Sequence, residues 1–531
     1  MSKLKVILFV LLSVAVLTTC KKEHDRPQWD VGVLGPLVKG SLGINNLIND
    51  TLLKVNPDST LTLVYNKNLY SLNIDSLFRI PDTTIVTPFH LFPHTFAPGS
   101  SFPGLPSQTN LAVSKVQLRY AIVKSGKAHI QATNKLHTRV YFTYNIPKAT
   151  LNGIPFVAHA SVDSATSIGP TVLDTLYDLS RYDLDLTGLS GNAVNSIEYS
   201  VQAYTDSFGP PVTVAFDTFL VIQNSFVGMV PYYAKGYLGQ TTLKVGPDST
   251  ALALFKTIKS GTLDLQAATM KLSLEYDIGM DARLNISNIQ SVNSNTNTSV
   301  DLIAPSLINN TININRASAS GTNTSPSYIP TFYSWLINNS NSNFKSLLNN
   351  LPDYLSFALS LQTNPLGNVS GDNDFAFADH LVNANIDVEI PLNFSSNHLT
   401  LSDTTGFSLG SDSVLNNLGA GTLTFNVDNG FPFALSISLV AIDSQNHFVD
   451  MLLSSATVAS PPLDTSFKVI NKLHSQFIIP VDDARIEKLR NAKRMIVTAS
   501  FTTAASPQHV KIYSDYSLDF KLIADIIYHV R

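Results

Sequence analysis

Most of this chain alternates apolar and small polar residues at every second position, and this pattern constrains its fold more than any other feature. The alternation is clearest in residues 139–144, 422–427 and 435–439. Successive side chains of a β-strand point to opposite faces, so the pattern is typical of antiparallel strands with one face in a core. Asn, Asp, Gly and Pro, which favour turns, separate the segments. We predict a mainly β protein of antiparallel sandwiches or strongly curved sheets, with a few short helices.

Short sequence matches in a constant order indicate an internal duplication. Gly126 precedes Asn134 by the same interval as Gly421 precedes Asn429. Three further pairs of segments match, namely 39–43 with 235–239, 53–60 with 243–250, and 173–175 with 463–465. Because turn chemistry alone favours a sequence such as Pro-Asp-Ser-Thr, convergence is the alternative explanation.

The offset between matching segments is roughly 190 residues early and roughly 290 later, so the second half carries an extra segment. We predict one β-rich half at 31–230 and a related half at 231–531, with an Asn- and Ser-rich, partly helical insertion near 280–390. Apolar residues at helical spacing predict two helices. One is a stripe of Phe344, Leu347, Leu348 and Leu351 before Pro352, and the other follows Asp482 or Asp483, with Ile486 and Leu489 inward.

The chain begins with a segment that is typical of a signal peptide. Lys3 and Lys5 are followed by an apolar run at 6–17 that is too short to span a bilayer as a helix. The run ends in Leu17-Thr18-Thr19-Cys20, which resembles the lipobox of bacterial lipoproteins. The resemblance implies a signal peptide at 1–19 and acylation of Cys20. Thr19 departs from the usual Gly, Ala or Ser, and the alternative is a plain secretory signal.

Residues 20–30 form a charged tether that resembles the start of many lipoproteins of the Bacteroidota. In that phylum, acidic residues after the Cys direct export to the outer face, and Glu23 and Asp25 match this in part. The resemblance implies a lipid-anchored protein of the outer membrane, on its periplasmic side or at the cell surface. The body resembles uncharacterised β-rich lipoproteins of the same phylum, which implies no activity.

Charge, cysteine content and motifs exclude several classes of function. Only 14% of the 531 residues are charged and the formal net charge is −4, so the chain lacks the basic excess that nucleic acids attract. A single cysteine excludes an internal disulfide and a CxxC metal site. No common catalytic or nucleotide-binding motif occurs. We therefore expect no enzyme, no cofactor and no nucleic-acid partner.

Two groups of residues are weak candidates for ligand binding. The first group has the carboxylate oxygens that calcium prefers, and its alternative is an ordinary polar turn; it consists of Asp372, Asp374 and Asp379. The second group could stack on a glycan, and its alternative is the core of the insertion; it consists of Tyr328, Phe332, Tyr333 and Trp335.

These observations favour a non-enzymatic protein that acts as an interaction or assembly module in the cell envelope. Its membrane contact is the acylated Cys20, and its expected partner is an outer-membrane protein. The first alternative is a carrier of lipid or another apolar ligand between curved sheets. The second is a surface lipoprotein that binds glycans.

Overall fold

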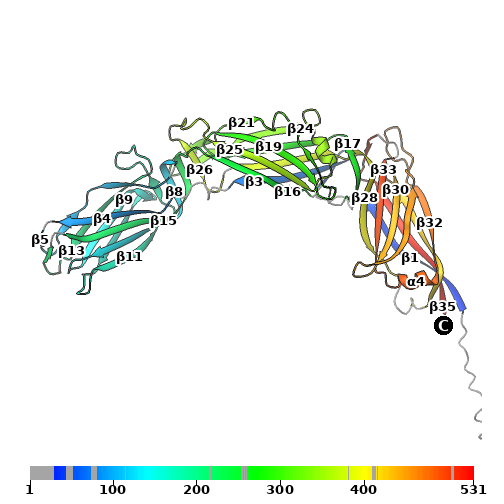
Figure 1. Ribbon diagram of the computed structural model, residues 1–531, viewed down its shortest axis with the longest axis horizontal. Coiled ribbons are helices and arrows are strands. Elements are labelled where there is room, and N and C mark those ends of the chain that lie inside the picture. Colours follow the sequence, from blue (N-terminus) through cyan, green and yellow to red (C-terminus); the bar gives the residue numbers. More distant parts are fainter. Residues whose placement is uncertain are drawn as a thin grey trace, which may run out of the picture.

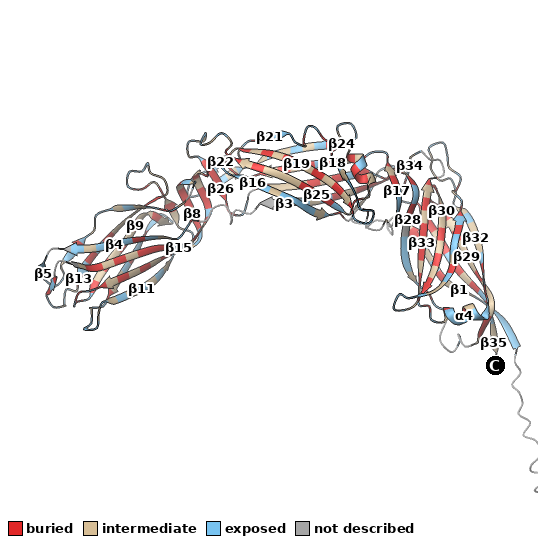
Figure 2. Cartoon of the chain, in the orientation of Figure 1, coloured by how far each residue is buried: buried red, intermediate tan, exposed pale blue. Residues whose placement is uncertain are grey.

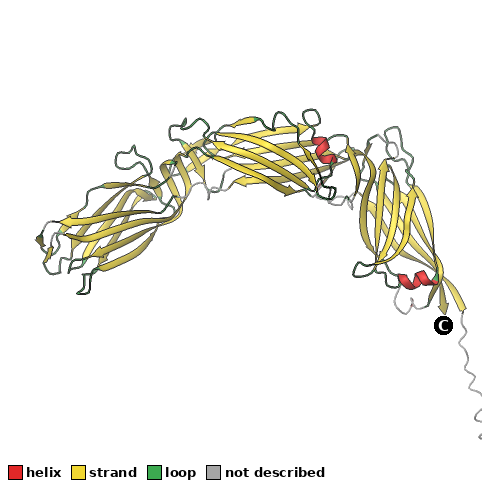
Figure 3. Cartoon of the chain, in the orientation of Figure 1, coloured by secondary structure: helices red, strands yellow, loops and turns green. Residues whose placement is uncertain are grey.

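The protein is an elongated arc of three β-units (Figure 1), which we name the base, middle and tip units. This computed structural model describes residues 29–43, 52–72, 80–91, 93–113, 115–214, 217–252, 260–380, 382–409, 417–503 and 508–530, with residues 255, 258 and 414. Strands make up most of these residues, with two short helices (Figure 3). The predicted mainly β, antiparallel fold is confirmed.

The base unit is a sandwich of two antiparallel sheets. The first sheet contains, in spatial order, β1 (Trp29–Gly43), β35 (Ser517–Val530), β29 (Leu418–Asn429) and β32 (Leu473–Val481). The second contains β17 (Ser260–Leu265), β28 (Asn393–Gly406), β33 (Arg494–Thr503), β30 (Phe433–Ile442) and β31 (Phe448–Val458), with β34 (Val510–Lys511) on β28. Helix α4 (Asp483–Leu489) precedes β33.

The middle unit is a second sandwich. Its first sheet contains β2 (Leu53–Val55), β3 (Leu61–Leu72), β27 (Val382–Pro391), β18 (Thr269–Tyr276) and β24 (Thr331–Asn338). Its second sheet contains β16 (Thr242–Ala251), β25 (Tyr354–Thr363), β19 (Ala282–Asn293) and β20 (Thr298–Asp301), with β21 (Thr311–Ile314) also on β19. A hairpin of β22 (Ser318–Gly321) and β23 (Pro326–Ile329) and helix α2 (Phe344–Asn349) complete it.

The tip unit is one sheet that curls into two layers. One layer contains β4 (Thr83–Leu91), β15 (Asp217–Tyr237), β8 (Gln117–Asn134) and β11 (Thr171–Asp178). Strand β12 (Asp183–Asp185) joins it to the other layer, which contains β6 (Ser101–Pro103), β7 (Ser107–Asn110), β13 (Ser196–Thr205), β9 (Val140–Leu151) and β10 (Ile154–Val162). The remaining pairings are β5 (His94–Phe96) with β14 (Val212–Val214), and β26 (Asp374–Phe377) with β15.

All three units share one topology of eight strands once additional short strands, such as β17 and β34 of the base unit, β2 of the middle unit and β12 of the tip unit, are set aside. Numbered along the chain within a unit, one layer has the order first, eighth, third, sixth, and the other has the order second, seventh, fourth, fifth. The first layers are β1-β35-β29-β32, β3-β27-β18-β24 and β4-β15-β8-β11. The second layers are β28-β33-β30-β31, β16-β25-β19-β20 and β7-β13-β9-β10. The units are nested, because the middle unit lies between the first and second strands of the base unit, and the tip unit lies between those of the middle unit.

The alternation in the sequence sets which side chains fill these cores. Strand β9 buries Val140, Phe142, Tyr144 and Ile146 and leaves the residues between them only partly buried, and Figure 2 shows the same banding in all three units. Both predicted helices are confirmed. Helix α2 buries Phe344, Leu347 and Leu348, and α4 begins after Asp482, whose carboxylate accepts from the backbone N of Arg485.

The third strand of each unit ends in a fully buried polar side chain that closes the following turn. That side chain donates to the carbonyl oxygen four residues later. The pairs are Asn134 with Thr138, Asn429 with Phe433 and Tyr276 with Met280, each at 2.9 Å. A buried polar group must be paired to avoid a large desolvation cost, so each residue ties its turn to one conformation.

The structure divides the chain differently from the predicted halves 31–230 and 231–531. Strand β1 pairs with β35, and β3 pairs with β27, so the first predicted half contributes strands to all three units. The predicted insertion at 280–390 forms most of the strands of the middle unit, and its described residues are α-helical only at α2.

The sequence matches fall into two kinds. Asn134 and Asn429 hold equivalent positions, at the ends of β8 and β29. In contrast, residues 39–43 lie in a first strand and 235–237 end an eighth strand, so their likeness reflects local strand and turn chemistry rather than equivalent positions.

Candidate functional site

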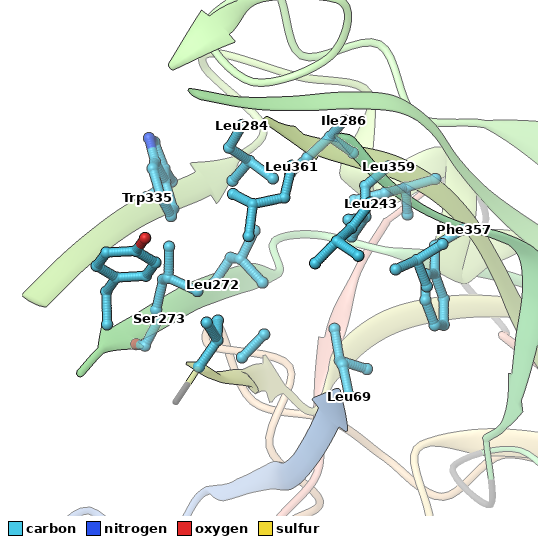
Figure 4. A pocket seen from close by; sticks show the side chains of 16 residues that line it. Leu69, Leu243, Leu272, Ser273, Leu284, Ile286, Trp335, Phe357, Leu359 and Leu361 are labelled. Carbon is cyan, nitrogen blue, oxygen red and sulfur yellow. The ribbon is translucent and has the colours of Figure 1, made fainter. Parts of the chain in front are cut away.

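The middle unit contains an apolar cavity of about 80 Å³ between its two layers (Figure 4). Strands β3, β27, β18 and β24 line it from one layer, and β16, β19 and β25 from the other. Leu, Ile and Val side chains form most of the wall, with Trp335 at one end of the row of strands.

The other two units pack the positions equivalent to Leu272 and Leu274 more tightly. Leu272 and Leu274 on β18 line the cavity and are each 7% exposed. The equivalent residues, counted back from the residue that closes the turn, are 0% exposed; they are Ile130 and Ala132 in the tip unit and Phe425 and Val427 in the base unit. The shared topology therefore does not require a hollow core.

An empty cavity of this size costs about 2 kcal/mol of folding free energy, at roughly 24 cal/mol per Å³. The only hydroxyl-bearing residues in its wall are Ser273 and Tyr276, and the Tyr276 hydroxyl donates to the Met280 carbonyl. Burial raises the pKa of Tyr276 far above its usual range, so that hydroxyl stays neutral. Buried water needs two to four polar partners, so the cavity suits an apolar occupant.

The four aromatic residues predicted as a patch do not lie together. Trp335 lines the cavity and stacks on Tyr333, with ring centroids 6.0 Å apart and planes at 10°. The Tyr333 hydroxyl accepts from the backbone N of Asn315 at 2.7 Å. Phe332 points to the opposite face of β24 and is exposed. These positions give no continuous aromatic platform.

Tyr328 instead belongs to a small core between the middle and tip units. Its ring lies 5.0 Å from that of Phe377, and the same cluster includes Tyr120 and Tyr233 of the tip unit. Its hydroxyl donates to Asp277 Oδ2 at 3.1 Å, and burial raises the pKa of the Asp277 carboxyl. Tyr328 thus packs in a core, as the alternative interpretation expected, but that core is shared with the tip unit.

The carboxylates predicted as calcium ligands join the same two units. Strand β26 lies between β25 and β27 of the middle unit along the chain, but it joins the sheet of the tip unit by pairing with β15. On either side of β26, Asp372 pairs with Arg119 at 3.4 Å and Asp379 pairs with Lys124 at 2.7 Å, and both cations lie on β8. Among the described residues, no group of three or more His, Cys, Asp or Glu side chains is placed to hold a metal.

Asp374 is the buried centre of this contact between the middle and tip units, which we call the joint. It accepts from Asn364 Nδ2 at 2.7 Å, from the backbone N of Leu238 at 3.1 Å and from Arg316 Nη1 at 3.3 Å. Arg316 also donates to both carboxylate oxygens of Asp281, which lowers the pKa of the Asp281 carboxyl. The three predicted carboxylates therefore bind three different cations and do not form one ligand set.

Two further predictions concern the start of the chain. Cys20 and the signal peptide at 1–19 lie outside the described residues. In the part that the structure describes, no helix has the length and apolar character needed to cross a bilayer.

The cavity wall and the joint contain residues that no motif in the sequence marks as candidates for a site. Leu272 and Leu274 follow the same alternation as any strand core, so no local signal separates a hollow core from a filled one. Arg119, Lys124 and Arg316 are separated from their carboxylate partners by 253, 255 and 58 positions, which hides the pairs from inspection of the sequence.

No family model and no curated protein matches this chain. Among solved structures, a presumed secreted protein of Parabacteroides distasonis is 10% identical, covers 95% of this chain and 100% of its own, and has a TM-score of 0.27. A structure of infectious bursal disease virus, Gx strain, is 8% identical over 86% of this chain and 83% of its own, with a TM-score of 0.13. Similarity at these scores supports no inference about function.

Proposed function

We propose that this protein is a non-enzymatic lipoprotein of the outer membrane that holds its tip unit away from the bilayer as an interaction or assembly module. The main support for this proposal is the nested path of the chain. This path brings both ends of the described chain to the base unit, at the opposite end of the arc from the tip unit (Figure 1). Cys20 precedes Trp29 by nine residues, which span at most about 30 Å. An anchor at Cys20 would therefore hold the base unit next to the membrane.

Exposed apolar side chains at the base end support this orientation. Trp29 and Leu34 on β1 and Phe448 on β31 are 53%, 73% and 66% exposed. Tryptophan favours the interface between lipid and water, so this surface suits the proximity of a bilayer.

Two loops at the far end of the tip unit supply a surface for a partner. Phe208 and Ile168 are 99% and 97% exposed. Their loops bind the same turn, since the backbone N of Asp206 donates to Arg139 O and that of Ala165 to Leu136 O. Burial of these side chains against a partner protein would remove apolar surface from water and would therefore favour binding.

The anchor is tested by replacing Cys20 with serine. We expect the C20S protein to move from the membrane fraction to the soluble fraction and to lose incorporation of labelled palmitate, because a single cysteine carries the lipid. Thr19→Gly keeps the cysteine and should remain in the membrane. Retention of the C20S protein in the membrane would contradict the anchor.

A further inference from the structure

We propose that strand β24 of the middle unit pairs with β24 of a second copy of this chain, so that two molecules form one continuous antiparallel sheet. The inference concerns the free edge of this strand. In the described part of the chain, β24 pairs with β18 on one side and with no strand on the other. The pairing does not depend on the anchor at Cys20 or on a partner at the tip unit.

Strand β24 lacks the residues that keep other edge strands from pairing. An exposed edge is a template for another strand, and charged residues or proline on the edge oppose such pairing. Among the described edge strands of eight or more residues, β24 alone has neither kind of residue. Each of the others contains at least one, for example Asp30, Lys67, Pro88, Pro155, Asp174, Lys244, Asp450 and Pro480.

The backbone of β24 has hydrogen-bonding groups available for a further strand. In an antiparallel pair, every second residue turns its N–H and C=O groups away from the neighbouring strand. Asn338 belongs to this set, because its N donates to Asn341 Oδ1 at 2.9 Å and its O accepts from Asn341 N. By the same alternation, the set includes Phe332, Ser334 and Leu336. Among the described residues, the one partner of these three outward backbones is Asn341, whose Nδ2 donates to Leu336 O at 2.8 Å.

The outward face of β24 has two apolar side chains that a further strand would cover. Phe332 and Leu336 are 67% and 59% exposed, with Ser334 between them. The neighbouring strand is charged on the same face, where Glu275 lies beside Phe332 and Lys271 beside Leu336. The apolar surface is therefore concentrated at the free edge, and its burial against a further strand would be favourable.

A second copy fits this edge because β24 is complementary to itself. Two antiparallel copies centred on Ser334 place Phe332 of each molecule opposite Leu336 of the other on the outward face. On the inward face, Tyr333 lies opposite Trp335. Cross-strand pairs of aromatic and aliphatic side chains stabilise a sheet, whereas like charges directly opposite destabilise it. A strand without charge meets no such repulsion from its own copy, and closed twofold pairs are the commonest assemblies of identical chains.

The shape of the arc leaves this edge open. Strands β3 and β24 lie at opposite edges of their layer, and β24 lies on the convex side, from which the base and tip units bend away (Figure 1). Strand β24 runs along the arc, from Tyr328 at the joint to Asn339, whose Nδ2 donates to Gln266 O next to β17 of the base unit. Antiparallel pairing therefore puts the two base units at opposite ends of the pair. Copies anchored at Cys20 would pair between two facing membranes, and this consequence alone rests on the proposed anchor.

The oligomeric state of the soluble protein tests the pairing. The full mature chain with Cys20→Ser would be studied by analytical ultracentrifugation over a range of concentrations, and its mass should double as the concentration rises. Ser334→Lys and Ser334→Glu each put like charges opposite each other at the centre of the pair, so either protein alone should stay monomeric. An equimolar mixture of the two should recover the doubled mass, because the introduced charges are then opposite in sign.

Gln476→Lys is the matched control for these variants. It adds the same charge to the outward face of β32, the equivalent edge strand of the base unit, and should pair like the parent. Because Ser334 is exposed, its variants should keep the parent's circular dichroism spectrum.

A parent chain that stays monomeric at every concentration overturns the proposal and leaves the edge to a strand of another protein. The proposal is also overturned if folded Ser334→Lys and Ser334→Glu proteins each pair like the parent, or if their mixture stays monomeric. Because every protein in this experiment lacks the anchor, its outcome is independent of the membrane fractionation of the C20S protein.

Discussion

Asp374→Ala is expected to lower the free energy of unfolding by about 3 kcal/mol, because it removes the buried carboxylate that joins the middle and tip units. The Asp374 side chain is 1% exposed and accepts three hydrogen bonds. Its loss leaves the buried backbone N–H of Leu238 without its acceptor and removes one of the two carboxylates that hold Arg316. A urea titration followed by circular dichroism measures the change.

Asp379→Ala is the matched control for this substitution. Asp379 lies five residues away and pairs with Lys124, but the two side chains are 53% and 43% exposed. Ion pairs that water reaches contribute about 0–1 kcal/mol, so this variant should remain close to the parent. Equal loss of stability in the two variants would show that Asp374 is not the centre of the joint.

Asn429→Ala is expected to destabilise the base unit by about 3 kcal/mol. Asn429 is fully buried, its Nδ2 donates to Phe433 O and Ala459 O, and its Oδ1 accepts from the backbone N of Phe431. Removing the side chain leaves these buried backbone groups without partners, and each such loss costs about 1–3 kcal/mol. Thermal unfolding by calorimetry measures the shift of the base-unit transition.

The equivalent substitution in another unit extends this prediction. Asn134→Ala should destabilise the tip unit by a similar amount, because its three partners are equivalent. Asn426→Ala is the control on β29, since Asn426 lies on the outward face and accepts one hydrogen bond from Gln476. An Asn429→Ala protein as stable as the Asn426→Ala protein would contradict the role of the buried amide.

Local features of the fold could be predicted from the sequence because local physics determines them. Alternation placed strands β9, β29 and β30, and the stripe of Phe344, Leu347 and Leu348 placed α2. Asp482 and Asp483 were the two candidates for the start of α4, because an aspartate there accepts from the first free backbone N–H groups of a helix, and Asp482 is the one that does so. The equal spacing of Gly126 and Asn134 with Gly421 and Asn429 identified two equivalent turns.

The arrangement of the three units could not be predicted in the same way. Strand β1 pairs with β35 across almost the whole chain, and no local pattern encodes such a pairing. The middle unit was not recognised as a repeat because Tyr276 replaces the asparagine that closes the turn in the other two units. The cavity of the middle unit could not be predicted either, because Leu272 and Leu274 are compatible with a filled core as well as with a hollow one.

The central claim is that the base unit lies at the membrane and the tip unit projects from it. Acylated Cys20 cannot react with a thiol reagent, so one introduced cysteine is the single labelling site of the lipidated protein. Gln445→Cys in the β30–β31 turn of the base unit and Phe208→Cys in the tip unit would carry the same fluorophore, on protein reconstituted into vesicles that contain a lipid quencher. The account predicts strong quenching at position 445 and none at position 208, and equal quenching at the two positions would contradict it.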